Sequence, residues 1–379
     1  MTIFDRYILR SFLKTYCLWF FCFIGIYIIF DLFTKTDGFI RAGENVVGTL
    51  SLIARYYMVQ SLPFFDKISP VLCLTSAIIT IAMFMRNNEL VPVLAAGIPY
   101  LRVIKPIIFA VFFLTLGTAI SREFLLPHFL DVLQKDPAKY TQDFGTEVNA
   151  ATDHQSGIQI YGERAYSAEK RLFSPTIVLL NKSLTIHGKN ISAGNAYFLP
   201  KTEKHPAGYL LKEIQQPKEL LTSPSLVLEE GGQTIIITPK DAPWLAEDEC
   251  FVVSNIPFGY LATNEAWRGY ASTWEYIMAI RHQSLDLGKD IDSVIHSRVT
   301  QPFLDMTLLF IGLPIILRRG DRNVFKALGI VALLVGFFML IQFTSLFFGR
   351  NSEMPILGAW FPLFLFVPIA VYLYRNIDK

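Results

Sequence analysis

Long apolar runs dominate both ends of the chain. A helix needs roughly 20 apolar residues to cross a bilayer, because each residue advances it by about 1.5 Å. The runs that meet this requirement are Ser11–Phe33, a second that starts between Tyr56 and Ile68 and ends at Met85, Leu101–Ser121, Val299–Leu317, Val324–Phe348 and Pro355–Tyr374. The pattern therefore predicts six transmembrane helices in two groups of three.

The apolar part of this first run, from about Tyr16, follows the basic residues Arg6, Arg10 and Lys14, as in a secretory signal peptide. It continues to Phe33, however, which makes it longer than the apolar core of a signal peptide, and Thr34–Asp37 offers no small-residue cleavage site. We therefore predict that this run is a retained first span.

The start of the second span is amphipathic. Pro63, Asp66, Lys67 and Pro70 interrupt its apolar residues. We expect this part to lie partly in the membrane interface before the helix crosses, with Asp66 and Lys67 at that interface.

Between the third and fourth spans the pattern changes to short alternating runs separated by Pro, Gly, Asn and Lys. The runs are Gly157–Tyr161, Thr176–Leu180, Leu184–His187, Asn195–Leu199, Tyr209–Ile214, Ser225–Leu228, Thr234–Thr238 and Cys250–Ser254. Runs of this kind predict an antiparallel all-β sandwich or roll. The apolar triplet Ile235–Ile237 is expected to be a fully buried strand. The insert is either a plain scaffold domain or a surface for a lipid or a protein partner.

Two helical stretches are predicted to lead from the insert back to the membrane. The first opens at Ser272–Tyr276, with Ser272 or Thr273 as N-cap and an acidic residue in the first turn, and it runs to about Leu287. The second, Asp290–Arg298, continues into the fourth span. We expect the two to form a helical stalk.

Composition agrees with a membrane protein, and basic residues predict its orientation. Charged residues make up 17% of the chain and hydrophobic residues 52%, whereas soluble domains carry about 25% charged residues. With the N-terminus in the cytoplasm, the inner segments hold Arg6, Arg10, Lys14, Arg86, Arg102, Lys105, Arg318, Arg319, Arg322, Lys326, Arg375 and Lys379. The short outer loops then hold only Lys35, Arg41, Arg55 and Arg350. The positive-inside rule favours this orientation and places the insert outside the inner membrane.

The sequence contains no recognisable catalytic or metal-binding motif. Cys250 is the only cysteine of the insert, so no disulfide is expected within it, and no Cys/His cluster predicts a metal site. Gly188-Lys189 and Gly288-Lys289 lack the Ser or Thr that a nucleotide-binding Walker A loop requires. We predict no catalytic residues, no cofactor, no nucleic-acid partner and no ATP hydrolysis by this chain, so ATP-driven transport would need a separate subunit.

Charged residues within or beside the spans are candidate functional residues, because a charge in lipid is costly. Asp305 lies inside the fourth span, where it is either functional or a carboxylate that faces the helix bundle and pairs with a neighbour. Asp31 and Lys35 lie one turn apart at the outer end of the first span. Lys35 and Arg41 could meet the phosphates of an anionic lipid, with Asp31 beside them, or could simply extend to the headgroup layer.

The loop after the second span carries the most specific motif. Its sequence, Arg86-Asn-Asn-Glu89-Leu-Val-Pro-Val-Leu-Ala-Ala-Gly-Ile98, resembles the E-L-x-x-L-x-A-x-G-I signature of the lipopolysaccharide-export permease family, LptF and LptG, also called the YjgP/YjgQ family. Further matches to the family are Arg6-Tyr7 before the first span, Pro63 and Pro70, Leu126-Pro127 after the third span, and His296, Arg298, Pro302, Gly312 and Pro314 in the fourth. The resemblance extends over nearly the whole chain.

Three positions depart from the family pattern. Pro92 stands within the signature where a helix former is usual, and Pro99 follows it. Because proline is tolerated only in the first turn of a helix, we expect the loop helix to start near Pro92 or to be kinked there. Asp305 is the third departure.

The resemblance implies an architecture and a set of partners. It implies residues 1–121 as three transmembrane helices with a coupling loop at 86–100, residues 122–297 as a periplasmic β-jellyroll domain with its stalk, and residues 298–379 as three further helices. A second permease of the family would complete a central cavity, and a cytoplasmic ATPase dimer would dock on the loop. The coupling residues are expected to be Glu89, Leu90, Leu94, Ala95 and Gly97, although Glu89 could instead only cap a helix N-terminus.

The resemblance also implies lipopolysaccharide as the ligand, taken from the bacterial inner membrane and its lipids and passed to a periplasmic jellyroll bridge protein. A related glycolipid would leave the same sequence pattern, and an F-like partner, a G-like partner and a homodimer all stay open. Two other classes of function remain: a non-transporting scaffold whose β-domain docks periplasmic partners, and a membrane-embedded lipid-modifying enzyme, for which no convincing His or carboxylate cluster is present.

Overall fold

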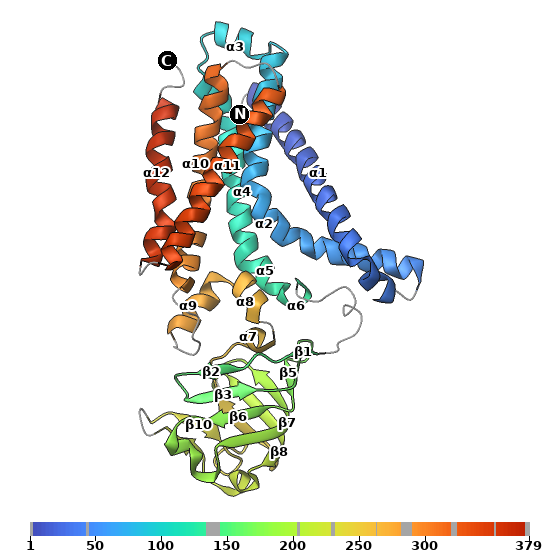
Figure 1. Cartoon of the computed structure of the whole chain (residues 1–379), viewed down its shortest axis with the longest axis vertical. Helices are drawn as coiled ribbons and strands as arrows, with labels where there is room; N and C mark the ends of the chain where they lie inside the picture. The colour runs from blue at the N-terminus through green and yellow to red at the C-terminus, as the bar shows by residue number, and fades with distance from the viewer. Residues whose placement is uncertain are drawn as a thin grey trace. The chain divides into compact units, whose positions relative to one another are not determined.

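The computed structural model describes residues 3–42, 45–133, 145–202, 205–228, 232–262, 264–281, 290–319, 324–351 and 354–375. Contacts divide the chain into two compact units. The first, called the bundle unit here, comprises Met1–Thr36, Gln60–Leu125 and Gly288–Lys379, and the second, the β unit, comprises Asp37–Val59 and Leu126–Leu287. Figure 1 shows the elements of both.

Several sequence expectations fall outside the described residues. These are the basic residues Arg322 and Lys379, the Gly288-Lys289 pair and the end of the helical stretch expected to reach Leu287.

Six described helices are long and apolar enough to cross a membrane, as predicted. They are α1 (Ile3–Ala42), α2 (Val46–Arg86), α4 (Tyr100–Ile120), α10 (Asp290–Arg319), α11 (Val324–Asn351) and α12 (Pro355–Arg375). The first two have 40 and 41 residues, so each is about 60 Å long, twice the roughly 30 Å of a hydrocarbon core. Apolar runs predict only the part of a helix that lies in lipid, which explains why both helices extend beyond the predicted spans.

The bundle unit has one apolar core to which all six helices contribute. Ile8 of α1, Leu72 of α2, Ile104 of α4 and Leu308 of α10 are buried in it. Glycines allow two close helix approaches. A Cβ added at Gly312 would clash with the Leu74 side chain, and one added at Gly358 of α12 would lie 2.7 Å from the Cα of Gly349 in α11.

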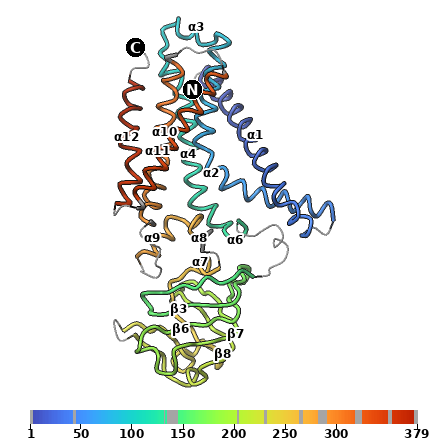
Figure 2. The backbone as a smooth tube through the Cα atoms, in the orientation of Figure 1, coloured from blue at the N-terminus to red at the C-terminus, as the bar shows by residue number. Residues whose placement is uncertain are grey.

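The short elements at one end of the bundle unit connect its second and third spans. Between α2 and α4 lies the six-residue helix α3 (Leu90–Ala95). Figure 2 shows that α3, the start of α1 and the end of α12 lie at the same end of this unit. At its other end, α4 continues into a π-helical turn, Ser121–Leu125.

The β unit is built on an 11-stranded sheet in which every strand pair is antiparallel. Its strands are β1 (Thr146–Glu147), β2 (Ala151–Asp153), β3 (Ile158–Tyr161), β4 (Arg164–Tyr166), β5 (Arg171–Phe173), β6 (Thr176–Leu179), β7 (Asn190–Leu199), β8 (Gly208–Gln216), β9 (Leu226–Val227), β10 (Thr234–Ile237) and β11 (Cys250–Val253). One path through the sheet runs β1-β4-β5-β7-β8-β11-β10-β9, and β2-β3-β6 branches from β7. The predicted membrane bundle with an all-β insert is confirmed.

Most of the predicted strands are present. Burial follows the alternation of apolar residues in β3 but not in β10, whose apolar triplet was expected to be fully buried and is buried only in part. Ile158 and Ile160 of β3 are buried, as are Ile235 and Ile236 of β10, whereas Ile237 is only half-buried. The strands β1, β2, β4 and β5 were not predicted, because two or three residues are too few to show a period of two.

The strand predicted at Leu184–His187 is wrong. Lys182–His187 forms a 3-10 helix, and the side chain of Asn181 caps it by accepting a hydrogen bond from the Ser183 amide at 3.2 Å. Leu184 is buried while Ile186 is exposed. Two alternating apolar residues satisfy a strand pattern here, but the Asn cap stabilises a helical turn.

Short helices complete the β unit. Those of the α type are α5 (Leu126–His128), α6 (Leu130–Leu133), α7 (Phe258–Ala262), α8 (Asn264–Tyr270) and α9 (Thr273–Arg281), and η4 (Lys218–Thr222) is a second 3-10 helix. Ser272 caps α9 as predicted: the Glu275 amide donates to Ser272 Oγ at 3.2 Å, and the Ser272 amide donates to Glu275 Oε2 at 2.8 Å. The predicted stretch Asp290–Arg298 is the start of α10, in one helix with the fourth span.

Candidate functional site

The loop that carries the family signature folds as a short helix between two turns. Asn88 has φ +58°, a left-handed conformation that asparagine tolerates, and it separates α2 from α3. Gly97 has φ +78°, where a side chain would be strained, and it ends α3 with its amide donating to the Leu94 carbonyl at 2.9 Å. The glycine of the signature is therefore required by the turn that closes the helix.

The loop helix starts near Pro92, as expected. The helix α3 begins at Leu90, so Pro92 is its third residue. The backbone amide of a residue in the first turn has no carbonyl acceptor within the helix. The amide hydrogen that proline lacks therefore costs no hydrogen bond at this position. Pro99 takes the N-cap position of α4 with an extended backbone, ψ 153°.

The predicted coupling residues do not all face outward. Leu90 is buried in the bundle core, and Leu94 is half-buried against that core. Ala95 and Gly97 are exposed, and so is Val91. The leucines therefore hold the helix on the bundle, whereas the small residues and Val91 form its free face.

Glu89 is half-buried at the N-cap position of α3, and its side chain makes no capping hydrogen bond. Its Oε1 accepts a hydrogen bond from the Asn87 side-chain amide at 3.2 Å. Tyr7 of α1 interacts with the same carboxylate, and its ring stacks on Phe84 with centroids 5.4 Å apart. Glu89 thus joins the signature loop to the first turns of α1.

A second contact connects the same segments. Arg102 at the start of α4 pairs with Asp5 of α1 at 3.4 Å, and the Asp5 side chain is 10% exposed. Both residues line a groove of about 440 Å³, together with Phe4, Pro92 and Val93. The first turns of α1, α3 and the start of α4 are therefore in contact.

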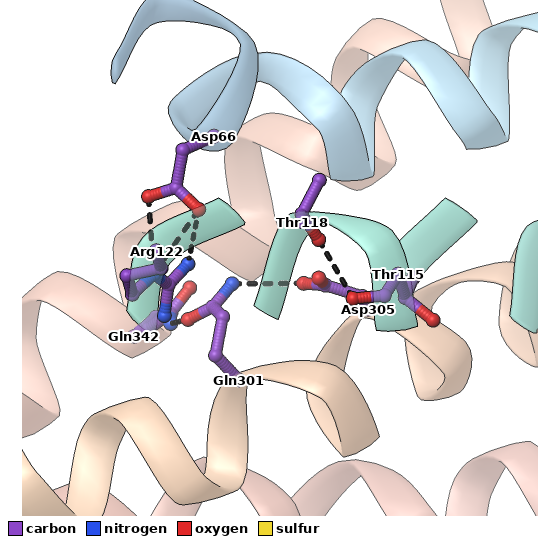
Figure 3. A network of polar contacts seen from close by, with 7 residues as sticks. All are labelled: Asp66, Thr115, Thr118, Arg122, Gln301, Asp305 and Gln342. Atoms are coloured by element: carbon purple, nitrogen blue, oxygen red, sulfur yellow. Dashed lines mark hydrogen bonds and ion pairs between the residues drawn. The ribbon is translucent and has the colours of Figure 1, made fainter. Parts of the chain in front are cut away.

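A polar network lies inside the bundle unit toward the opposite end of α4 (Figure 3). Arg122, in the π-helical turn, grips Asp66 of α2 with two nitrogens: Nε lies 3.1 Å from both carboxylate oxygens, and Nη2 lies 2.8 Å from Oδ1. Both side chains are under one-fifth exposed. Asp66 was expected at the membrane interface, and sequence reasoning missed its partner, because the two residues are far apart along the chain.

Asp305 lies in the same region and is 6% exposed. Its Oδ1 accepts a hydrogen bond from the Gln301 side chain at 2.8 Å, and the Gln301 Oε1 accepts one from Gln342 of α11 at 2.9 Å. The structure thus places Asp305 as a carboxylate that faces the bundle and pairs with a neighbour. Neither glutamine was singled out in the sequence, because only charged residues within or beside the spans were taken as candidates.

The residues expected to meet a lipid phosphate do not form one cluster. Lys35 pairs with Asp31 one turn earlier, with Nζ 3.0 Å from a carboxylate oxygen. Arg41 is exposed. The spacing of Lys35 and Arg41 is not three, four or seven residues, so the two project from different sides of α1.

The comparison with protein families decides the identity of this arrangement. The family model described as Lipopolysaccharide export system permease LptF/LptG matches residues 6–141 and 134–376. The chain belongs to this family. No curated protein matches the sequence. As an LptF/LptG permease, the chain is a multi-pass membrane protein of the lipopolysaccharide export system.

Membership gives the separate observations a common context. The permease presents the signature loop on α3, and the Arg6-Tyr7 motif supplies the tyrosine that contacts Glu89 of that loop. Two motifs that are far apart in the sequence therefore meet at one place in the bundle unit. Among the residues that the structure describes, no group of three or more His, Cys, Asp or Glu side chains could hold a metal ion.

Proposed function

We propose that this chain is the permease subunit of an ATP-driven exporter that extracts lipopolysaccharide, or a related glycolipid, from the inner membrane and passes it to a periplasmic bridge protein. The observation that carries this proposal is the α3 loop, which presents an exposed face and is joined to α1 by the contact of Glu89 with Tyr7. Family membership supports the substrate class.

On the cytoplasmic side, a separate ATPase dimer docks on α3. The exposed Val91, Ala95 and Gly97 offer a flat apolar face without long side chains, which suits insertion into a groove of a partner. Glu89 supplies the charge, because it lies at the base of the helix with no capping bond of its own. Leu90 anchors the helix so that the loop moves as one body.

Movement of the loop reaches the membrane through α1. Tyr7 and Asp5 connect the first turns of α1 to Glu89 and Arg102, so a displaced loop pulls on that helix. The apolar side chains of α1 are largely exposed: Phe21 is 68%, Phe30 73% and Phe33 80% exposed. We propose that this face and that of a second permease enclose the acyl chains of the lipid.

At the outer end of α1, Lys35 is the proposed phosphate contact. Lys35 forms an ion pair with Asp31. A lipid phosphate can break this ion pair, because it competes with the Asp31 carboxylate for the Lys35 ammonium. Arg41 acts independently from another side of the helix. The β unit then receives the lipid and passes it to the bridge protein.

The coupling role is tested with Glu89→Lys in the full-length chain. We expect the ATPase to be lost from the purified complex and lipid release to stop, because the charge that meets the partner is reversed. Asn88→Asp is the matched control: it changes charge at the neighbouring position, and aspartate tolerates the left-handed turn.

If Glu89→Lys retains both the ATPase and transport, the coupling role of Glu89 is wrong. If no ATPase accompanies even the unchanged chain, the scaffold function replaces the exporter, since a scaffold needs no ATPase.

The lipid site is tested by charge reversal. We expect Lys35→Glu and Arg41→Glu to weaken photocrosslinking to lipopolysaccharide, and Asp31→Asn to strengthen it by releasing Lys35. Arg55→Glu, another exposed outer position, serves as control. Crosslinking that is equal in all four variants would show that these side chains only extend to the headgroup layer.

A further inference from the structure

A second apolar groove in the bundle unit has no part in the export mechanism above. It lies among α4, α10 and α12 and has a volume of about 900 Å³. Its wall is formed by apolar side chains such as Ile108, Phe303, Met306, Phe310 and Val367. Thr307 also lines it, but its hydroxyl donates to the Phe303 carbonyl at 2.6 Å, so the threonine presents no unsatisfied donor to an apolar occupant.

The length of the groove corresponds to one leaflet of a membrane. Its lining residues on α12 extend from Leu363 to Arg375. At about 1.5 Å per residue, that stretch is about 18 Å long. Half of a hydrocarbon core of roughly 30 Å is about 15 Å. The groove therefore accommodates an acyl chain of a single leaflet.

Two cations mark one end of the groove. Lys105, in the second turn of α4, and Arg375, the last residue of α12, both line it, and both side chains are exposed. None of the described residues that line the groove is acidic. The end with the cations is also the end of the bundle unit that carries α3 (Figure 2), which the positive-inside rule places in the cytoplasm.

We propose that this groove binds one anionic phospholipid of the cytoplasmic leaflet. The lipid phosphate lies between Lys105 and Arg375, and one acyl chain fills the apolar wall beneath them. A zwitterionic lipid fits the wall equally well but brings no net negative charge to the two cations. This lipid is distinct from the exported one of the proposed function, whose phosphate contact is placed at the outer end of α1.

The experiment uses the full-length chain in nanodiscs made from equal amounts of phosphatidylglycerol and phosphatidylcholine. Lipid that stays bound after transfer to mild detergent is identified by native mass spectrometry. We expect the unchanged chain to retain phosphatidylglycerol. Lys105→Ala combined with Arg375→Ala should lower the ratio of retained phosphatidylglycerol to phosphatidylcholine about 30-fold, since each basic residue near an anionic lipid contributes about a factor of five.

The matched control is Arg10→Ala combined with Lys14→Ala. It removes the same charge from exposed positions of α1 at the cytoplasmic end, outside the groove, and should leave the ratio unchanged. Val371→Trp tests the apolar wall: Val371 lines the groove and is 60% exposed, so tryptophan fills the space without disturbing the core. We expect this variant to lose both retained lipids.

Three results would overturn the proposal. The first is an unchanged lipid ratio in the Lys105/Arg375 variant. The second is an equal loss in the control variant, which would indicate a general surface charge effect. The third is crosslinking of a photoreactive residue at position 371 to a protein instead of a lipid, which would show that a partner helix occupies the groove. Unaltered gel-filtration elution of each variant confirms that it is folded.

Discussion

The two units stabilise their buried charges in different ways. In the bundle unit, the helices satisfy their own backbone groups, so buried carboxylates must find side chains on other elements. Asp66 pairs with Arg122, and Asp305 is bonded to Gln301, which is itself bonded to Gln342 of another helix. A charge in this unit therefore connects helices.

In the β unit, a buried carboxylate serves loop backbone instead. Asp153 is completely buried, and its Oδ1 accepts hydrogen bonds from the amides of Gln155 and Ser156 at 3.1 and 3.2 Å. Its Oδ2 accepts from Ser254 Oγ at 2.7 Å and from the Asn255 amide at 3.3 Å. Asp153 thereby joins the turn after β2 to the segment after β11, which are far apart in the sequence.

The residues around Asp153 are also buried from solvent. Tyr209 beside it is completely buried and donates its hydroxyl to the Ile256 carbonyl at 2.9 Å. Burial, together with the Asp153 charge, raises the pKa of Tyr209 well above its ordinary value. A helix satisfies its own backbone groups, so buried carboxylates of the bundle unit bond to side chains. The loops of the β unit leave backbone amides without a partner in a strand or helix, and Asp153 accepts hydrogen bonds from such amides.

The largest effect is expected from Arg122→Leu. It leaves Asp66 buried without its partner, which costs about 3–5 kcal/mol. The added substitution Asp66→Leu should restore most of this loss, because it removes the unpaired charge. Hydrogen exchange of α2 and α4 in detergent measures both. Equal instability of the single and double variants would mean that the unpaired Asp66 charge is not the cause of the loss.

Asp153→Ala should give the next largest loss of stability, about 2–4 kcal/mol, because it leaves buried amide donors unsatisfied. Faster hydrogen exchange should be confined to the β unit, and α4 and α10 should be unaffected. Asp248→Ala, at an exposed position, is the control. Destabilisation that spread to the bundle helices would contradict the separate behaviour of the two units.

Gly358→Ala tests packing in place of charge. The new methyl group would press against Gly349, and overpacking of this kind costs about 1–3 kcal/mol. Gly336→Ala in α11 is the matched control, since nothing lies within 4 Å of its Cβ position. The control should be neutral or slightly stabilising, because alanine favours a helix. Thermal unfolding in detergent distinguishes the two.

Ser272→Ala should cost about 1 kcal/mol by removing the capping box of α9. Ser272→Thr should retain most of the stability, because its hydroxyl can accept the same Glu275 amide. Local hydrogen exchange of Thr273–Arg281 is the measurement. Loss of the helix in the threonine variant as well would point to a packing role for Ser272.

The smallest effect concerns a surface pair of the β unit. Lys212 lies 2.8 Å from Glu249, and this contact raises the pKa of Lys212 above its ordinary 10.5. A raised lysine pKa contributes stability below pH 10.5 that is lost as the pH rises through the folded-state pKa. Solvent screens the exposed ammonium, so Lys212→Met should cost at most about 1 kcal/mol at pH 7 and should flatten the alkaline limb of the stability curve. An unchanged alkaline limb would contradict this.

Much of the fold could be predicted, because span and strand patterns are local. Six apolar runs were sufficient to predict six helices, and alternation was sufficient for strands such as β8 and β10. Local pattern failed where other forces act over a few residues. Asn181 turns Leu184–His187 into a helix. Strands of two or three residues, such as β1 and β4, depend on pairing with neighbouring strands of the sheet.

The candidate site divides in the same way. The signature loop was recognisable because its residues are contiguous, and Gly97 was part of the motif before its φ of +78° explained the requirement. The contact of Tyr7 with Glu89 and the pairing of Asp66 with Arg122 could not be predicted. Each depends on which helices pack together, and hydropathy does not encode that choice.

By itself, the sequence determined that this chain spans a membrane, that its insert is a β structure and that it belongs with the lipopolysaccharide-export permeases. The preference of a side chain for water or lipid and the conformational preference of the backbone are properties of single residues and their neighbours. Both can therefore be predicted from the sequence. The tertiary structure alone decided that Leu90 anchors α3 while Ala95 stays exposed, and that Lys105 and Arg375 meet at one groove. Proximity between distant residues is a property of packing, which arises only when the helices come together.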